Sequence, residues 1–274
     1  VCAQCHVEYY FKGEAKYLTF PWDNGTTPEA IEKYYDNIEF TDWTHKLSRT
    51  PMIKAQHPGY EVFSTGVHFD RGVSCADCHM PYKSEGGQKF TDHHIQSPLN
   101  NISNSCQVCH REREEKLRQN VFARQSAVMQ VRLRLEDILA RTHIEAKTAW
   151  DAGATTEEMQ PVLKAIRSAQ WRWDYAAAGH GNSFHSPLEL ARTIGTGIDK
   201  AQEARIYLAQ LFTRYNIPQP ITMPDISTKE KAQQYIGWDM DKLNNEKQIF
   251  LKQVVPQWIK TAASRESKYE VKQL

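Results

Sequence analysis

The chain has 274 residues, with 34 basic against 33 acidic side chains and a mean hydropathy of −0.65. This balanced charge gives no reason to expect nucleic acid as a partner, and no apolar run is long enough to cross a bilayer, as in a soluble protein. The sequence starts at Val1 without an initiator Met or a signal segment, so we expect the C-terminal part of a longer protein.

Six cysteines are present, and all of them fall into three copies of the pattern C-x-x-C-H. Two intervening residues place both thiols along one edge of a haem, where they add to its vinyl groups, and the next residue brings an imidazole to the iron. We therefore predict three covalently attached haems c. The copies are motif 1 (Cys2, Cys5, His6), motif 2 (Cys75, Cys78, His79) and motif 3 (Cys106, Cys109, His110).

Other interpretations of the cysteine pairs fit less well. A four-thiolate zinc site uses C-x-x-C pairs two at a time, whereas this chain has three pairs, each followed by His. A thioredoxin-like motif would occur once, within a βαβ pattern. Because covalent haem attachment is normally completed outside the cytoplasm, the motifs also predict a location in a bacterial periplasm.

Residues 1–111 hold all three motifs and eight of the eleven His, and their hydrophobic periodicity is weak. Haems are large apolar bodies, so side chains packed around them can replace much of an ordinary core, and long loops become tolerable. We expect a loop-rich haem-binding region over residues 1–111 and a bundle of long helices over residues 112–274. The predicted fold class is therefore mainly α.

The helical pattern begins after residue 111. Apolar residues recur there at three, four and seven residue steps, which predicts an amphipathic helix that runs to about Trp150 and ends at Gly153. A capping box at residues 155–158 predicts the start of a second helix, which continues toward Ala178. The stripe of the first helix consists of Leu117, Val121, Val128, Val131, Leu135 and Ile138.

Two further helices follow. Ser186 as N-cap and Pro187 at the first helical position predict a third helix that reaches Tyr215. A last helix is expected to begin near Ser227 and to run past Gly237, with Pro256 as a kink or break. Beyond the haem motif itself, we find no internal repeat.

The second axial ligands of the haems have to come from the remaining His or Met side chains. The eight other His exceed the need, and His68, His93, His94 and His185 lie where a ligand would be useful. Any one of them taken alone is more often a hydrogen-bonded or solvent-facing imidazole. Counting therefore does not assign individual ligands.

Taken in order, the motifs of this chain resemble those of the pentahaem cytochrome c nitrite reductases, periplasmic enzymes that reduce nitrite to ammonium. The resemblance extends over essentially the whole chain, including the later helices. It rests on motif 1 with the following Val7-Glu8-Tyr9-Tyr10, on Lys54-Ala55-Gln56-His57-Pro58-Gly59-Tyr60-Glu61, on motif 2 with Met80-Pro81-Tyr82, on His93-His94, on motif 3 and on Gly181-Asn182-Ser183-Phe184-His185-Ser186-Pro187.

The resemblance implies that Tyr9 and His57 line the distal pocket of the catalytic haem. Nitrite is an anion that must take up electrons and protons repeatedly, so hydrogen-bond donors and an imidazole near its nitrogen suit the reaction. From the residues alone, Tyr9 could equally be a packing aromatic, and His57 a spare axial ligand.

The resemblance also implies a calcium ion beside this pocket, bound by the Glu8 carboxylate, the Gln56 side-chain oxygen and the backbone carbonyls of Tyr9 and Lys54. All four are hard oxygen donors of the kind that Ca²⁺ prefers. The same two segments carry Tyr9 and His57, so the ion would fix both side chains. The alternative is that Glu8 is simply solvated.

By the same resemblance, three His side chains serve as distal haem ligands. His68 would serve the haem of motif 3, and His185 the haem of motif 2. His94 would serve a haem attached before Val1, with its neighbour His93 as the alternative.

Several parts of the family pattern are absent from the sequence. They are the C-x-x-C-K motif of the catalytic haem, another C-x-x-C-H haem, a catalytic Arg and the distal His for motif 1. We expect these, with two more haems, before Val1, and we expect residues 1–274 alone to be inactive.

The resemblance further implies a periplasmic or membrane-bound cytochrome as electron donor, and a homodimer formed through long helices. Two other functions stay open. One is a purely electron-transferring multihaem cytochrome with all haems bis-His ligated. The other is a multihaem enzyme that acts on hydroxylamine or sulfur oxyanions, although that group does not share the Lys54–His57 segment.

Overall fold

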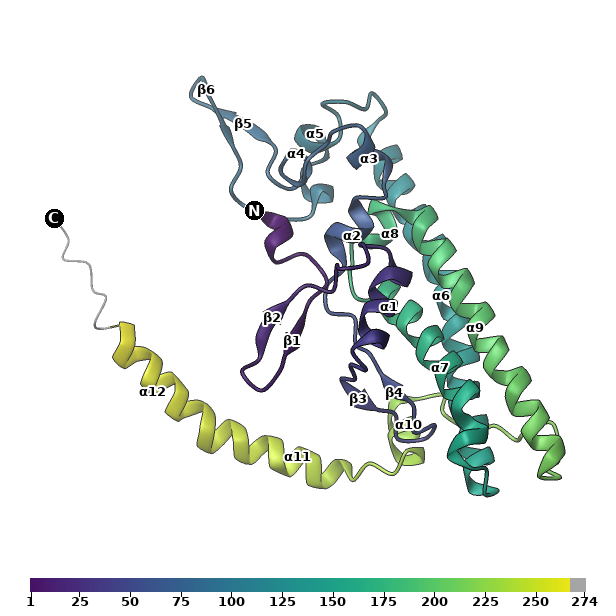
Figure 1. The fold of residues 1–274 in the computed structure, drawn as a ribbon. Helices are drawn as coiled ribbons and strands as arrows, with labels where there is room; N and C mark the ends of the chain where they lie inside the picture. The colour runs from purple at the N-terminus through teal and green to yellow at the C-terminus, as the bar shows by residue number, and fades with distance from the viewer. Residues whose placement is uncertain (267–274) are drawn as a thin grey trace. The chain divides into compact units, whose positions relative to one another are not determined.

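The computed structural model describes residues 1–266, which fall into two compact units, Val1–Ile221 and a shorter unit that starts at Thr222. The first unit is built around three long helices and several short helices and hairpins (Figure 1). The prediction of a mainly α fold is confirmed. Within the described residues, no helix is both long and apolar enough to cross a membrane.

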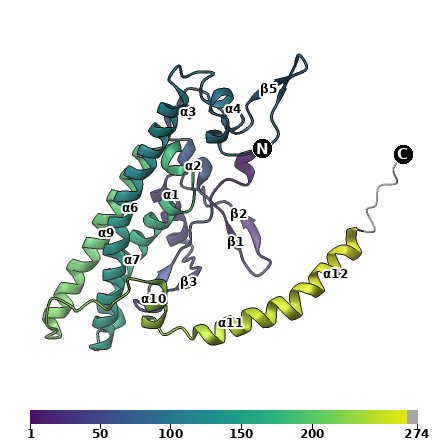
Figure 2. The same cartoon turned by 180° about the vertical axis from the view of Figure 1, so that it is seen from behind.

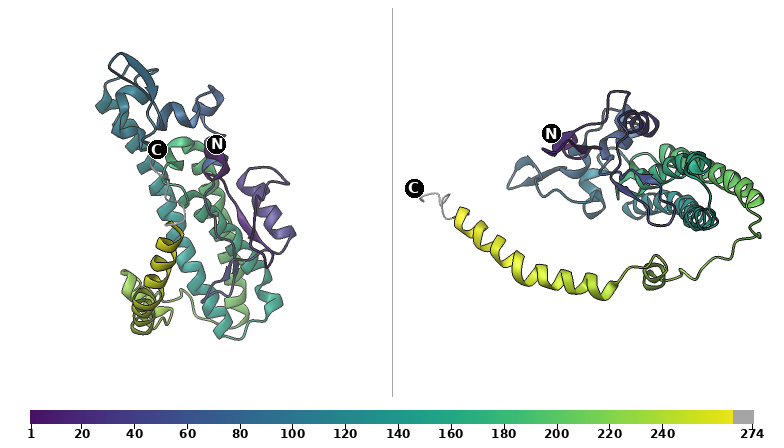
Figure 3. Two further views of the ribbon diagram at one scale, coloured as in Figure 1. Left: turned by 90° about the vertical axis from the view of Figure 1, so that its left-hand side faces the viewer. Right: turned by 60° about the horizontal axis from the view of Figure 1, so that its bottom comes forward.

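The long helices are α6 (Glu114–Asp151), α7 (Thr156–Ala177) and α9 (Pro187–Arg214), and each of them contacts the other two. They run side by side, as Figure 2 shows from behind and Figure 3 from two further directions. The predicted stripe of α6 faces this bundle, because Leu117, Val121, Val128 and Leu135 are buried. The first three predicted helices are therefore confirmed.

The two helix starts that the sequence predicts differ in detail. The capping box at the start of α7 is present, since Thr155 and Glu158 exchange side-chain to backbone hydrogen bonds. Ser186 occupies the N-cap position of α9 but makes no capping hydrogen bond. Its hydroxyl instead donates to the carbonyl of Thr65 at 3.3 Å, which ties the start of α9 to the haem-binding region.

Residues 28–62 pack directly on the bundle. The indole of Trp171 on α7 donates to the carbonyl of Pro28 at 2.8 Å, and the Arg167 guanidinium binds Asp36 at 2.9 Å. The same guanidinium donates to the carbonyls of Phe40 and Pro51. The haem motifs end at His110, whereas the division between compact units falls after Ile221.

The rest of the first unit consists of short elements, as expected for a loop-rich region. Three antiparallel hairpins pair β1 (Tyr10–Lys12) with β2 (Tyr17–Thr19), β3 (Trp43–Thr44) with β4 (Pro51–Met52), and β5 (Tyr82–Glu85) with β6 (Gln88–Thr91). The short helices are η1 (Cys2–Gln4), α1 (Pro28–Asn37), α2 (Gly59–Phe63), α3 (Val67–Asp70), α4 (Cys75–His79), η2 (Pro98–Asn100), α5 (Ile102–Ser105) and α8 (Asn182–His185).

The second unit corrects the predicted last helix. Gly237, with φ of +69°, ends α10 (Lys229–Tyr235), and the Asp239 side chain caps α11 (Met240–Ile249), so no single helix runs past Gly237. A left-handed glycine stops a helix because the chain can turn there without a Cβ clash.

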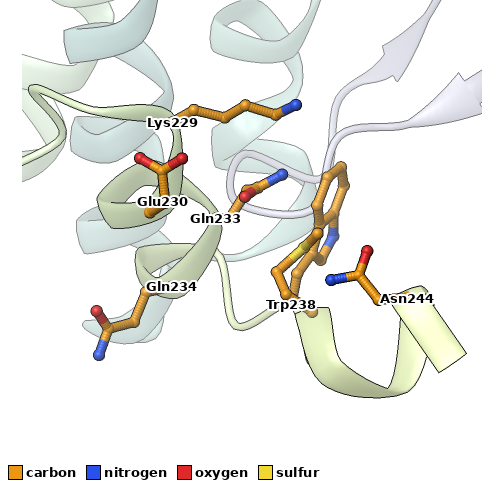
Figure 4. A pocket seen from close by; sticks show the side chains of 7 residues that line it. Lys229, Glu230, Gln233, Gln234, Trp238 and Asn244 are labelled. Carbon is orange, nitrogen blue, oxygen red and sulfur yellow. The ribbon is translucent and has the colours of Figure 1, made fainter.

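Pro256 does not break the helical segment that contains it. It lies in α12 (Val255–Glu266), directly after a π turn, η3 (Phe250–Val254), which joins α11 to α12. A wider turn just before a proline accommodates its ring and its missing N–H. Figure 4 shows a hollow between α10 and α11 that includes Lys229, Trp238 and Asn244, and no predicted site residue lines it.

Candidate functional site

Each C-x-x-C-H motif adopts a helical turn. In motif 2 a capping box between Ser74 and Asp77 fixes the start of α4, and in motif 3 the His110 N–H donates to the carbonyl of Cys106. Such turns bring both thiols and the following imidazole to one side of the chain. None of the six cysteines forms a disulfide bond.

The three motifs are neighbours in space. Burial, followed by the nearby Cys2, raises the pKa of Cys75. Burial and then Cys106 raise the pKa of Cys78 to about 11. Motif 2 therefore lies between motifs 1 and 3. Among residues 1–266, no three His, Cys, Asp or Glu side chains converge on one point.

Two His pairs have the spacing of a haem ligand pair. The ring centres of His68 and His110 are 6.2 Å apart, and those of His79 and His185 are 6.4 Å apart. Iron–imidazole bonds of about 2 Å on opposite faces place two ring centres roughly 6 Å apart. Each pair therefore has room for one iron. These are the pairs that the resemblance implies, and the assignment itself stays a prediction.

The environment of the second pair suits ligation. The Nδ1 atom of His79 lies 2.9 Å from the carbonyl of Gln96, an orientation that leaves its Nε2 free for a metal. Burial lowers the pKa of His185 to about 4, which keeps its imidazole neutral at physiological pH. Gly66 packs against the backbone of His185 so closely that an added Cβ would lie 2.1 Å from the His185 carbonyl oxygen.

His57 does not form such a pair. Its ring centre is 4.7 Å from that of His6, which leaves no room for an iron between the two imidazoles. Its buried Nδ1 has no hydrogen-bond partner among the described residues. Gly59 makes the approach possible, because a Cβ there would lie 3.1 Å from that Nδ1 atom. The geometry is that of a side chain next to motif 1 and not opposite His6.

Glu8 joins the two segments that hold the predicted catalytic residues. Its carboxylate accepts hydrogen bonds from the Gln56 amide at 2.8 Å, the His57 amide at 3.3 Å and the Tyr35 hydroxyl at 3.0 Å. The side chain is fully buried, not solvated as the alternative had it, and burial raises its pKa to about 8. Tyr9, the next residue, is half-buried and packs its ring edge against Phe11.

The other predicted calcium ligands lie in the second segment. The side-chain amide of Gln56 donates from Nε2 to the Lys54 carbonyl at 3.4 Å. The Gln56 side chain and the Lys54 carbonyl, two of the predicted ligands, are therefore neighbours. The Lys54 ammonium is directed to Asp174 on α7 at 2.8 Å, and the Ala55 amide donates to the same carboxylate. Segments 6–9 and 54–57 therefore lie together and are held on the bundle.

Sequence reasoning missed Glu61, Tyr35 and Asp174, which hold this region in place. Glu61 is 1% exposed, and its Oε1 accepts hydrogen bonds from the Glu8 amide and the Trp22 indole, both at 2.9 Å. Tyr35 and Asp174 belong to no recognisable motif, whereas Glu61 ends the Lys54–Glu61 run on which the resemblance rests. The proximity of Glu61 to His57 in the sequence was the one available signal.

The His93 and His94 alternatives stay open. Both side chains are exposed, and the Nδ1 of His93 lies 2.8 Å from the carbonyl of Thr91. The His94 amide donates to Asp92, which orients its backbone. Neither ring makes a ring contact with the His of motifs 1 to 3.

A comparison with known families decides where the chain belongs. The model of the family described as cytochrome c552 matches residues 1–268. The chain belongs to the cytochrome c552 family. It is 60% identical over 262 residues to cytochrome c-552 of Parabacteroides distasonis and 57% identical over 265 residues to that of Porphyromonas gingivalis. These alignments cover 96% and 97% of this chain but 53% of each relative, so the chain spans about half of their length.

A solved structure supports the same relationship. The chain is similar to the cytochrome c nitrite reductase of Desulfovibrio desulfuricans, with 32% sequence identity and a TM-score of 0.71. The match covers 88% of this chain and 51% of the other. That enzyme is described as a catalytic subunit with two calcium sites. This chain is thus similar to a cytochrome c nitrite reductase in both sequence and fold.

Proposed function

We propose that this chain is part of a periplasmic multihaem cytochrome c that reduces nitrite to ammonium. The observation that carries the proposal is the joining of segments 6–9 and 54–57 through Glu8, together with the His57 ring whose centre lies 4.7 Å from that of His6 in motif 1. A purely electron-transferring cytochrome has no need for a half-buried imidazole that is too close to its neighbour to share an iron. The similarity to a nitrite reductase supports the same function.

Haem c fits the three motifs. The six thiols are free, the motif turns are helical, and two His pairs have an iron-sized separation. Under the proposal, His68 and His185 are the distal ligands of motifs 3 and 2, and His94 serves a haem of the preceding part of the protein. When bound, the haems supply electrons, and the nitrite-binding iron belongs to that preceding part.

His57 and Tyr9 have the tasks of binding nitrite and delivering protons. The His57 imidazole is the proposed donor of a hydrogen bond to an oxygen of nitrite, and the Tyr9 hydroxyl provides a second donor. Donors held in place by the surrounding backbone stabilise developing negative charge without reorganising. Gly59 allows the backbone to pack closely against the His57 ring, because a Cβ there would lie 3.1 Å from Nδ1.

Calcium fits beside this pocket because Glu8 lacks a cation. No ion pair among the described residues involves Glu8, although the carboxylate is fully buried. A buried carboxylate needs a compensating charge. We propose that Glu8, Gln56 and the carbonyls of Tyr9 and Lys54 hold the ion, which supplies that charge and fixes both segments.

Assembly and electron supply are further parts of the proposal. Phe122, Met129 and Leu133 are 49%, 43% and 51% exposed on α6, and their spacing places them on one side of the helix. This apolar face supports a homodimer through the long helices. A periplasmic or membrane-bound cytochrome is the proposed electron donor.

The function is tested in a reduced-dye assay for ammonium. The complete protein, including a C-x-x-C-K motif, should reduce nitrite, whereas residues 1–274 alone should not. His57→Ala in the complete protein should lower turnover by a factor on the order of 10² while haem spectra stay unchanged, because the residue donates protons and does not bind iron. His180→Ala, at an exposed position, is the control. Ammonium production by residues 1–274 would assign catalysis to one of the three motifs.

A further inference from the structure

Glu61 lies where the two segments of the site meet. It belongs to α2, one helical turn after His57, and its Oε1 accepts hydrogen bonds from the Glu8 amide and the Trp22 indole. The neighbouring Tyr60 amide donates to the His6 carbonyl at 2.8 Å. Two hydrogen bonds thus join α2 to the segment that carries Glu8 and Tyr9.

The second carboxylate oxygen of Glu61 has no role in this contact. Oε2 is buried without a hydrogen-bond partner among the described residues, and the side chain is 1% exposed. No ion pair of residues 1–266 includes Glu61. If Glu61 only accepted these two hydrogen bonds, a neutral side-chain acceptor would serve equally well. Such an acceptor would avoid the cost of burying a charge.

Glu8 and Glu61 therefore form a pair of buried carboxylates without a Lys or Arg partner among the described residues. The two residues are in direct contact, because the Glu61 Oε1 accepts the hydrogen bond of the Glu8 amide at 2.9 Å. Two adjacent anions in a region of low dielectric repel each other strongly. Such a pair is stable when a divalent cation lies beside it, because the cation interacts favourably with both charges.

We propose that Glu61 is the second carboxylate of the calcium site and strengthens calcium binding through its negative charge, outside the four proposed ligands. This inference rests on the proposed function. It predicts that the affinity for Ca²⁺ depends on the charge of Glu61, which is separate from its hydrogen bond to the Glu8 amide. Affinity of oxygen sites for Ca²⁺ rises with the number of negative charges near the ion.

The test is calcium titration of the complete, haem-loaded protein by calorimetry after treatment with a chelator. Glu61→Gln keeps the shape and an acceptor oxygen, and it should weaken Ca²⁺ binding by about tenfold, because one charge near the ion is lost. Trp22→Phe removes a hydrogen-bond donor of Glu61 but keeps the charge, and it should change the affinity by less than about twofold. Glu14→Gln, in the exposed β1–β2 turn, controls for net charge.

Each outcome decides the inference. Unchanged Ca²⁺ affinity in Glu61→Gln would overturn the inference. An equal loss of affinity in Trp22→Phe would also overturn it, because the hydrogen bonds of Glu61 and not its charge would then be the important feature. Glu61→Asp retains the charge and should bind Ca²⁺ more tightly than Glu61→Gln, and the reverse order contradicts the proposal. Absence of calcium binding in the unsubstituted protein would refute the calcium site of the proposed function, and this inference with it. A loss of nitrite turnover alone would affect neither affinity comparison.

Discussion

Residues 64–110 and the helix bundle bury their apolar side chains to very different extents. In residues 64–110, Pro81 and Ile102 are the only buried apolar side chains, whereas Val67, Phe69, Ile95 and Val108 are 40% to 69% exposed. Helix α7 buries a continuous series of apolar residues against α6 and α9. The bundle has a core of its own, and residues 64–110 do not.

The difference follows from what each region packs against. The exposed apolar side chains of residues 64–110 lie near motifs 2 and 3 in the sequence, where bound haems would provide apolar partners. In the bundle the partners are other helices, as for Leu135, Ile166 and Leu208, all fully buried. A region that uses cofactors as its core needs little hydrophobic periodicity, and a bundle cannot form without it.

The largest expected effect follows from removing a haem. Cys75→Ala combined with Cys78→Ala prevents attachment at motif 2 and should lower the hydrogen-exchange protection of residues 64–110 by about 100-fold or more, because local structure there depends on the haem. Amides of α7 should keep their protection and serve as the internal control. Equal loss in both regions would show that the bundle also depends on the haem.

Axial ligands give the next largest effect. His185→Ala should leave the haem of motif 2 without a distal ligand, because the ring lies 6.4 Å from that of His79. A new high-spin signal in the absorption and electron paramagnetic resonance spectra is expected. The matched control is His180→Ala, an exposed residue near the start of the same α8 segment. A spectrum that stays low-spin in both variants would remove His185 from the ligand set.

The same contrast explains what the sequence could predict. Helices α6, α7 and α9 follow from apolar spacing and from the residues at their starts, which are local properties. The haem motifs are equally local. The last helix was wrong at Gly237, because a single glycine inside a polar stretch gives no periodic signal that distinguishes a tolerated residue from a helix end.

The candidate site was predictable only through the resemblance. Tyr9, His57 and Glu8 lie in two segments about fifty residues apart, and no spacing rule connects them. Glu8 joins those segments, and Tyr35 and Glu61 hold it in place through hydrogen bonds that depend on tertiary structure. Single polar residues in otherwise ordinary surroundings carry no pattern that would reveal such contacts.

Asp174 connects the site to the bundle, and its removal tests how strongly the two depend on each other. It accepts hydrogen bonds from the Lys54 ammonium at 2.8 Å and the Ala55 amide at 2.9 Å. Asp174→Asn should lower the free energy of unfolding by about 3 kcal/mol, since it breaks a largely buried, charge-assisted contact. Asp151→Asn, in an exposed pair with Lys147, should cost less than about 0.5 kcal/mol. Equal effects in denaturant titrations would contradict a special role for Asp174.

The smallest effect concerns pH and separates the bundle from the haem ligands. His45 and His143 stack with ring centres 3.7 Å apart, and the Nδ1 of His143 lies 2.9 Å from the Ser48 hydroxyl. Burial lowers the pKa of His45 to about 4, and burial together with the charge of His45 lowers the pKa of His143 to about 3, from 6.5. Both imidazoles are thus neutral in the folded chain, whereas the unfolded chain takes up protons below pH 6.5. The contribution of the two imidazoles to the free energy of unfolding is therefore fully present above pH 6.5 and decreases as the pH falls toward 4. At pH 5 the loss per imidazole should be about 2 kcal/mol.

Replacing His143 by Gln should reduce the loss of unfolding free energy between pH 7 and pH 5 by about that amount, measured by denaturant titration at both values. An unchanged pH dependence would show that the pair does not control acid stability, and haem spectra that changed over the same range would place the sensitive group at an axial ligand instead.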